Sequence, residues 1–113
     1  MKRLSRKERQ LRINANMLKV KGYKHDFNCV KFSTQNSKEH ELKKAEACLD
    51  AQHKGFDFLT EVEFKQGGRA DIYLPEVDYV VEILHTESEK SFDNKDYPVK
   101  RKLKFRTDEV INL

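Results

Sequence analysis

The sequence predicts a small α/β domain, and three observations support this fold class. A helical segment at residues 37–54 precedes strand-like segments at 56–64, 69–74 and 79–84. The third strand is almost continuously apolar, as in a central strand that is buried on both faces. The length of 113 residues suits one domain with a single core. Because the hydrophobic share is only 37%, we expect that core to be thin.

The predicted helix at 37–54 has clear start and stop signals. Ser37 is the expected N-cap, acidic residues follow in the first turn, and Gly55 ends the helix. Leu42, Ala45 and Leu49 share one face of this helix, and Cys48 lies at its border. We predict that this face is the buried one.

Turn residues separate the strands that follow. Gly67 and Gly68 supply a hairpin turn between the first two strands, and Pro75 ends the second. Beyond the third strand, we predict a helix at 86–95 and a short basic strand at 102–105. The last two elements have the weakest sequence signals.

Basic residues concentrate at the two ends of the chain. Residues 1–36 form a basic segment that is part of, or appended to, a core at 37–113. Within the basic segment we expect a short helix and then a strand at 27–32. A second basic stretch lies at 100–106, and the acidic residues concentrate at 39–96. The formal charge of +4 alone would not prove a polyanionic ligand.

Two cysteines, Cys29 and Cys48, lie far apart without a CxxC motif, so the sequence predicts neither a zinc knuckle nor a disulfide framework. No apolar run approaches the length that spans a membrane, and no signal-peptide core follows the basic start. We therefore expect a cytoplasmic protein without membrane contact.

Two carboxylates occupy strand positions where apolar residues are expected. Asp71 follows Ala70 near the start of the second strand, and Glu82 interrupts the apolar third strand. Such charges are costly unless they are paired. On neighbouring strands, the two acids would converge on a hard cation such as Mg²⁺. The alternative is that Asp71 closes the glycine turn and Glu82 pairs with a nearby Lys or Arg.

A longer motif surrounds these two acids. It consists of a helix with Glu, then Glu61-Val62-Glu63-Phe64, a glycine turn, Gly68-Arg69-Ala70-Asp71-Ile72, a spacer and Val81-Glu82-Ile83-Leu84. Residues 37 to about 105 thus resemble the core of the PD-(D/E)XK nuclease superfamily, which includes archaeal Holliday junction resolvases and restriction endonucleases. The resemblance implies a restriction-endonuclease-like core, with a central mixed β-sheet flanked by helices.

The resemblance also implies an activity and a metal site. The activity is that of a Mg²⁺- or Mn²⁺-dependent endodeoxyribonuclease, which hydrolyses phosphodiester bonds in DNA. Asp71, Glu82 and Glu41, or Glu39 in place of Glu41, match the metal-binding acids. The alternative is a catalytically inactive DNA-binding protein that retains the nuclease fold, and a weaker alternative is a partner-binding protein whose acids are incidental.

The lysine of the family motif does not carry over, because Leu84 occupies its position. Members of the superfamily relocate this lysine, and Lys65, Lys90 and Lys44 are the candidates here. The proposed catalytic set is Asp71, Glu82, Glu41 and Lys65.

Two histidines and one further acid have alternative interpretations. His85 would either flank the acid or lie in solvent at a strand end. His40 would either contact phosphate or metal, sharing a helical face with Lys44, or lie exposed. Glu63 would either add a metal ligand or be solvated.

The basic segments are candidates for contacts with the DNA backbone. The alternative is a solubilising surface. Arg69 would either contact phosphate or pair with Glu63 or Glu82. The aromatic residues near the basic segments, Tyr23, Phe27 and Tyr97, are too sparse to predict stacking platforms. Related small nucleases often act as symmetric dimers, which is consistent with a homodimer here. The predicted nucleic-acid contacts are Lys2, Arg3, Arg6, Lys7, Arg69, Lys100, Arg101 and Lys102.

Overall fold

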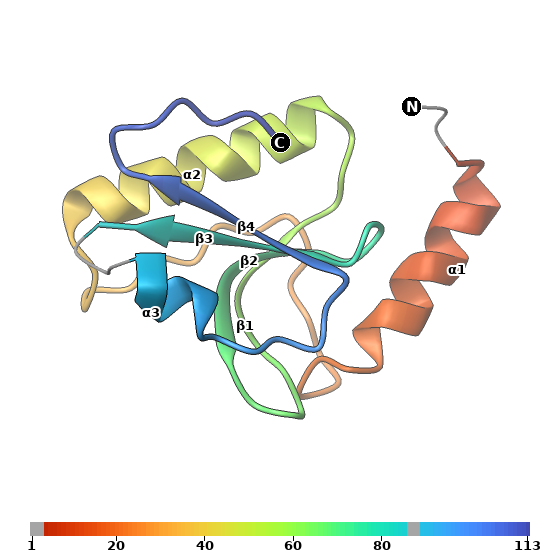
Figure 1. Ribbon diagram of the computed structural model, residues 1–113. Coiled ribbons are helices and arrows are strands. Elements are labelled where there is room, and N and C mark those ends of the chain that lie inside the picture. Colours follow the sequence, from red (N-terminus) through yellow and green to blue (C-terminus); the bar gives the residue numbers. More distant parts are fainter. Residues whose placement is uncertain (1–3, 86–88) are drawn as a thin grey trace.

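The computed structural model describes residues 4–85 and 89–113, and it is an α/β fold with a four-stranded mixed sheet (Figure 1). The strands lie in the order β1-β2-β3-β4; the first three form antiparallel neighbours, and β4 runs parallel to β3. A parallel neighbour requires a crossover connection, which here contains α3. The elements in chain order are α1 Arg6–Met17, α2 Lys38–His53, β1 Leu59–Glu63, β2 Arg69–Leu74, β3 Tyr79–Leu84, α3 Glu89–Asp93 and β4 Arg101–Arg106.

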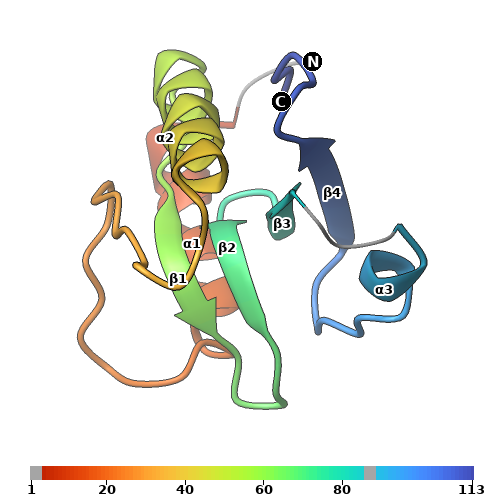
Figure 2. The same ribbon diagram turned by 90° about the vertical axis from the view of Figure 1, so that its left-hand side faces the viewer.

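Helices flank the sheet on both faces. Helix α2 packs on β2 and β3, and the views of Figures 1 and 2 place α3 on the side away from α2. On the α2 face the core consists of Ala47, Cys48, Ala51, Phe58, Ile72, Leu74, Val81, Ile83 and Ile111. On the opposite face it consists of Val20, Leu59, Val62, Phe64, Ala70, Tyr73, Val80 and Tyr97. Strand β3 contributes to both clusters, which explains its nearly continuous apolar sequence.

The predicted start and end of α2 are confirmed. Its predicted buried face is wrong for Leu42 and Leu49, although Cys48 at the border of that face is buried. Ser37 caps the helix, because its hydroxyl accepts a hydrogen bond from the His40 amide at 3.1 Å. Leu42 and Leu49 are 60% and 57% exposed. The side of α2 that faces the sheet instead carries His40, Glu41, Lys44, Ala47, Cys48 and Ala51. Its alanines let the helix approach the sheet, while its charged residues form the ion-pair network described below.

The N-terminal segment forms the predicted helix, α1, but not the predicted strand at 27–32, which is a loop. Helix α1 is attached near the β2–β3 turn. Arg9 Nε lies 3.0 Å from Glu76 Oε1, and Asn16 Nδ2 donates to the Pro75 carbonyl at 2.6 Å.

The C-terminal elements follow the expected order with different bounds. Helix α3 is shorter than the predicted helix, of which residues 86–88 lie outside the described residues. The ammonium group of Lys102 donates to the carbonyls of Phe92, Asp93 and Lys95, and so holds the end of α3 against β4. Across the described ranges, no helix combines the length and apolar character needed to cross a membrane.

Candidate functional site: a buried carboxyl cluster

The candidate site begins where regular pairing between β2 and β3 stops. The last paired residues are Ile72 and Val81, so the next step of the ladder sets Asp71 opposite Glu82. There, Asp71 Oδ2 accepts a hydrogen bond from the Ile83 amide at 2.8 Å. The Asp71 carboxylate thus accepts a hydrogen bond from a β3 backbone amide, and this places it beside the Glu82 side chain.

Asp71 and Glu82 form a buried carboxyl pair. Their side chains are 14% and 4% exposed, and their carboxyl groups are hydrogen-bonded to each other. Burial and the adjacent Asp71 raise the pKa of Glu82 to about 8. Burial also opposes ionisation of Asp71, but hydrogen bonds from His40, Glu82 and the Ile83 amide lower its pKa. One proton shared by two carboxyls is the expected state of such a pair.

His40 links this pair to the first turn of α2. Its Nε2 lies 3.3 Å from Asp71 Oδ2, and its Nδ1 lies 2.9 Å from Glu41 Oε1. The hydrogen bond with Asp71 is the main cause that raises the pKa of His40 to about 9, against the opposing effect of burial. An imidazolium therefore lies between two carboxylates at neutral pH.

Glu41 is fixed by a dense set of donors. It accepts hydrogen bonds from the Ser33 amide at 3.0 Å and from Asn36 Nδ2 at 2.9 Å, and its Oε2 lies 2.8 Å from Lys44 Nζ. Burial disfavours the charged carboxylate, but the hydrogen bonds from Lys44, Asn36 and His40 outweigh it and lower the pKa to about 2. Glu41 is therefore ionised throughout the physiological range.

Lys44 is a fully buried cation with a complete set of acceptors. Besides Glu41, its ammonium group contacts Glu61 Oε1 at 2.8 Å and the Lys31 carbonyl at 2.6 Å. An ammonium group has three donors, and three acceptors engage them here. Burial lowers the pKa of Lys44, but the two glutamates more than offset this and raise it. Lys44 thus positions the two carboxylates.

Glu61 reaches this network because β1 is distorted there. Its φ of 53° lies in the left-handed region, which costs on the order of 1 kcal/mol or more for a residue with a side chain. Its second carboxylate oxygen lies 3.0 Å from Arg69 Nε. The ion pairs with Lys44 and Arg69 offset this backbone strain.

The other side of Glu82 contacts the segment between α3 and β4. The hydroxyl of Tyr97 is hydrogen-bonded to Glu82 Oε1 and to the Arg69 carbonyl. Lys95 Nζ lies 3.9 Å from Glu82 Oε1, and the Lys95 side chain is 33% exposed. Lys95 thus contacts the buried Glu82 carboxyl and also reaches solvent.

The structure brings together some of the predicted site residues. Asp71 and Glu82 are in contact, and Glu41 joins them through His40. Four other candidates lie elsewhere. Glu39 is exposed, Glu63 lies beside Lys21, and Lys65 lies in the exposed β1–β2 turn. His85 is exposed, and its Nδ1 lies 3.4 Å from the Thr107 hydroxyl. Leu84, which occupies the position of the family's lysine, is buried. The Lys90 side chain lies outside the described part of the chain.

Sequence reasoning left His40 open between a phosphate or metal contact and an exposed position, whereas it lies between Glu41 and Asp71. It missed the contacts of Lys95 and Tyr97 with Glu82. For His40, the available signal was its i,i+4 spacing with Lys44, which places both on one helical face. Lys95 and Tyr97 lie in an irregular segment whose path the sequence pattern does not define.

The predicted basic contacts are distributed over several surfaces. Arg6 and Lys7 lie exposed on α1, and Lys100 and Arg101 lie exposed at the start of β4. The ammonium group of Lys102 is engaged with backbone carbonyls, and Arg69 pairs with Glu61. Lys2 and Arg3 lie outside the described residues.

Comparison with protein-family models, with curated proteins and with solved structures finds no match for this chain. The chemistry of the site therefore has to be argued from its own residues.

The oxygen donors of Asp71 and Glu82 are of the type that a hard divalent cation prefers. A proton that satisfies two neighbouring carboxyls occupies a position that a small cation is suited to take. Glu41 does not complete a three-residue site, because His40 lies between it and Asp71. Within residues 4–85 and 89–113, no group of three or more His, Cys, Asp or Glu residues is arranged to hold a metal ion.

Proposed function

We propose that the protein is a Mg²⁺-dependent DNA endonuclease. The observation that carries this proposal is the buried Asp71–Glu82 pair, located where two central strands separate. Two carboxyls in this position are costly for stability and share one proton. They are easier to explain as part of a reaction site than as structural groups.

The order of elements supports the proposal. After α1, the chain forms helix α2, then the antiparallel strands β1 to β3, then α3 and the parallel strand β4. The acids that the nuclease resemblance implies lie on α2, β2 and β3. A restriction-endonuclease-like core is therefore part of this proposal.

Asp71 and Glu82 would hold the cation, and Glu41 would assist through the hydrogen-bonded His40. A bound divalent cation lowers the pKa of a coordinated water and offsets charge on the phosphate. His40 keeps Asp71 ionised, and Tyr97 orients the Glu82 carboxyl. Lys95, which lies beside Glu82 and reaches solvent, offers a cationic donor to the phosphate.

The experiment is a cleavage assay on supercoiled, linear, flap and four-way DNA in Mg²⁺ and in Mn²⁺. We expect cleavage that EDTA abolishes and that Asp71→Asn reduces at least about a hundredfold. Glu46→Gln, which changes an exposed acid on α2 paired with Lys43, is the matched control and should retain activity. Intact DNA of all four kinds in both metals would refute the proposal.

The second candidate function is a DNA-binding protein that retains this fold without catalysis. Two observations favour it: Leu84 is buried at the motif position where a lysine is expected, and an imidazolium lies between Asp71 and Glu41. This alternative predicts salt-dependent DNA binding without cleavage. Binding that is unchanged after charge reversal in both basic segments would exclude it.

A further inference from the structure

The exposed aromatic residues gather on one loop. The chain has 7 Phe and 4 Tyr, all within the described residues. Three of them are exposed, namely Tyr23 at 99%, Phe32 at 64% and Phe27 at 38%, and all three lie in the loop at 19–32. The other aromatic side chains are buried or half-buried in the two core clusters or beside them. The fold thus covers its aromatic rings everywhere except on this loop.

The same loop is basic. It contains Lys19, Lys21, Lys24 and Lys31 against a single acid, Asp26. The Lys19 ammonium group is engaged by Asp78 and the Pro98 carbonyl, so Lys21, Lys24 and Lys31 are the lysines that the platform can use. Lys21 and Lys31 make exposed ion pairs with Glu63 and Asp26, at 3.6 and 3.3 Å. Such exposed pairs are weak, so a phosphate can readily compete for these lysines.

The loop is held in place along the free edge of β1. The Lys21 amide donates to the Glu63 carbonyl at 2.8 Å, and the Asn28 amide donates to the Phe58 carbonyl at 2.8 Å. The Thr60 hydroxyl accepts from the Lys31 amide at 2.9 Å. These contacts present the aromatic rings on a fixed backbone, which reduces the entropy lost when a ligand binds.

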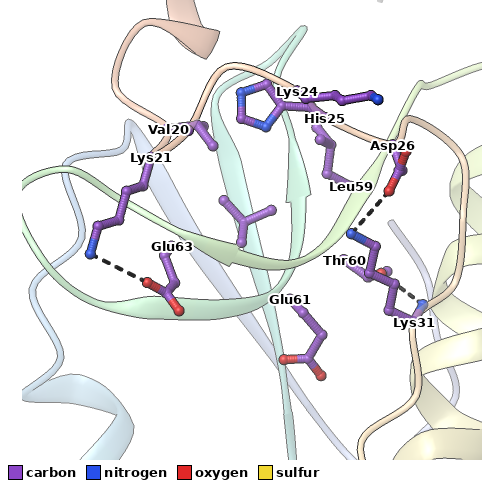
Figure 3. A pocket seen from close by; sticks show the side chains of 12 residues that line it. Val20, Lys21, Lys24, His25, Asp26, Lys31, Leu59, Thr60, Glu61 and Glu63 are labelled. Carbon is purple, nitrogen blue, oxygen red and sulfur yellow. Dashed lines mark hydrogen bonds and ion pairs between the residues drawn. The ribbon is translucent and has the colours of Figure 1, made fainter.

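Between the loop and β1 lies a hollow of about 280 Å³ (Figure 3). Its lining includes Lys21, Lys24 and His25 from the loop and Leu59 and Thr60 from β1. Asp26, Glu61 and Glu63 also line it, so the hollow mixes cationic and acidic groups with apolar side chains. The exposed Tyr23 lies between lining residues in the sequence.

The loop leads directly to the carboxyl cluster. The Lys44 ammonium group lies 5.9 Å from the centre of the Phe32 ring, and the next amide, that of Ser33, donates to Glu41. An extended ligand that follows the loop from Tyr23 to Phe32 would thereby reach the candidate site.

We propose that the loop at 19–32 is a binding platform for unpaired nucleotides, with bases stacked on Tyr23 and Phe32 and phosphates held by Lys24 and neighbouring lysines. Exposed rings with cations among them are the features by which proteins bind single strands without sequence preference. Paired bases in a duplex do not expose their faces to a side chain in this way. This inference rests on the proposed function in one respect: it names the nuclease's substrate as a single strand or a structure with unpaired nucleotides.

The test measures binding of fluorescein-labelled oligothymidine of about 15 nucleotides, and of a duplex of equal length, in EDTA. The Asp71→Asn protein is used so that cleavage does not affect the measurement. Failure of binding can therefore be distinguished from failure of cleavage in the nuclease assay. We expect tighter binding of the single strand, weakened at least about fivefold by Tyr23→Ala and by Phe32→Ala. Tyr23→Trp should retain binding, and its fluorescence should be quenched by the oligonucleotide.

Leu42→Ala is the matched control, since Leu42 is 60% exposed beside the site but offers no ring. It should leave the affinity for the single strand unchanged. Equal affinity for duplex and single strand, or no loss in the two alanine variants, would overturn the proposal. Absence of oligonucleotide binding at low salt would also overturn it and would favour a protein partner for the aromatic loop.

Discussion

The ionised state of His40 should make the stability of the fold depend on pH. The largest cause of its raised pKa is the hydrogen bond to Asp71, and the imidazole side chain is 10% exposed. A change from 6.5 to about 9 corresponds to roughly 3 kcal/mol, at about 1.4 kcal/mol for each pH unit. His40→Gln removes this charge and keeps a side chain of similar polarity.

The sign follows from the protons bound in each state. Between about pH 6.5 and pH 9 the folded protein retains the His40 proton that the unfolded chain has lost, so stability falls as the pH rises. The contribution of His40 is complete below about pH 6.5. Glu82, whose folded pKa is also raised, adds a loss of stability between about pH 4.5 and pH 8.

The assay is urea unfolding of the wild type and of His40→Gln at about pH 6 and about pH 9.5. We expect the difference in unfolding free energy between the two proteins to shrink by roughly 3 kcal/mol at the higher pH. His53→Gln, at the exposed end of the same helix, is the control and should follow the wild type. Parallel pH profiles for the wild type and His40→Gln would refute this account of His40.

Three further predictions concern the surroundings of the site. Gly68→Ala should lower thermal stability by about 1–3 kcal/mol, because φ is +91° and a Cβ would lie 3.0 Å from the Tyr97 ring; calorimetry that shows no change would contradict this. Lys44→Met should cost about 3–5 kcal/mol in urea unfolding because it removes the buried ammonium group that Glu41 and Glu61 share, and a neutral effect would be inconsistent with a positioning role. If DNA is cleaved, Lys95→Ala should slow single-turnover cleavage about tenfold or more without loss of stability, and an unchanged rate would exclude Lys95 as the phosphate-contacting cation.

Local signals predicted most of the fold. Ser37 and Gly55 bounded α2, Gly67 and Gly68 marked the hairpin, and the apolar run in β3 indicated a central strand. These features act through contacts between near neighbours in the chain, which a sequence pattern records. The strand expected at 27–32 failed because this segment binds the edge of β1 through only a few hydrogen bonds.

The buried face of α2 could not be predicted from hydrophobicity. Its first turns face the sheet with His40, Glu41 and Lys44. Glu41 is held by local donors, but His40 and Lys44 pair with the distant acids Asp71 and Glu61. Because these partners lie on β1 and β2, the sequence near α2 contains no sign of them. Leu42 and Leu49 therefore appeared to be the core residues, although both are exposed.

The candidate site was predictable only in part. Asp71 and Glu82 were predicted as site residues because each is a charge within an apolar strand, and their carboxyl groups are hydrogen-bonded to each other. The role of His40 between two acids depends on how α2 sits over the sheet, and the proximity of Lys95 depends on an irregular segment. Both are consequences of tertiary packing.

We propose that the Asp71–Glu82 pair binds a divalent cation. Crystals soaked in Mn²⁺ above the raised pKa of Glu82, at about pH 8.5, test it most directly through anomalous scattering. We expect one strong peak that both carboxyl groups contact in place of their shared proton. A map without a peak at this pair, with the two carboxyls still hydrogen-bonded to each other, would contradict the claim.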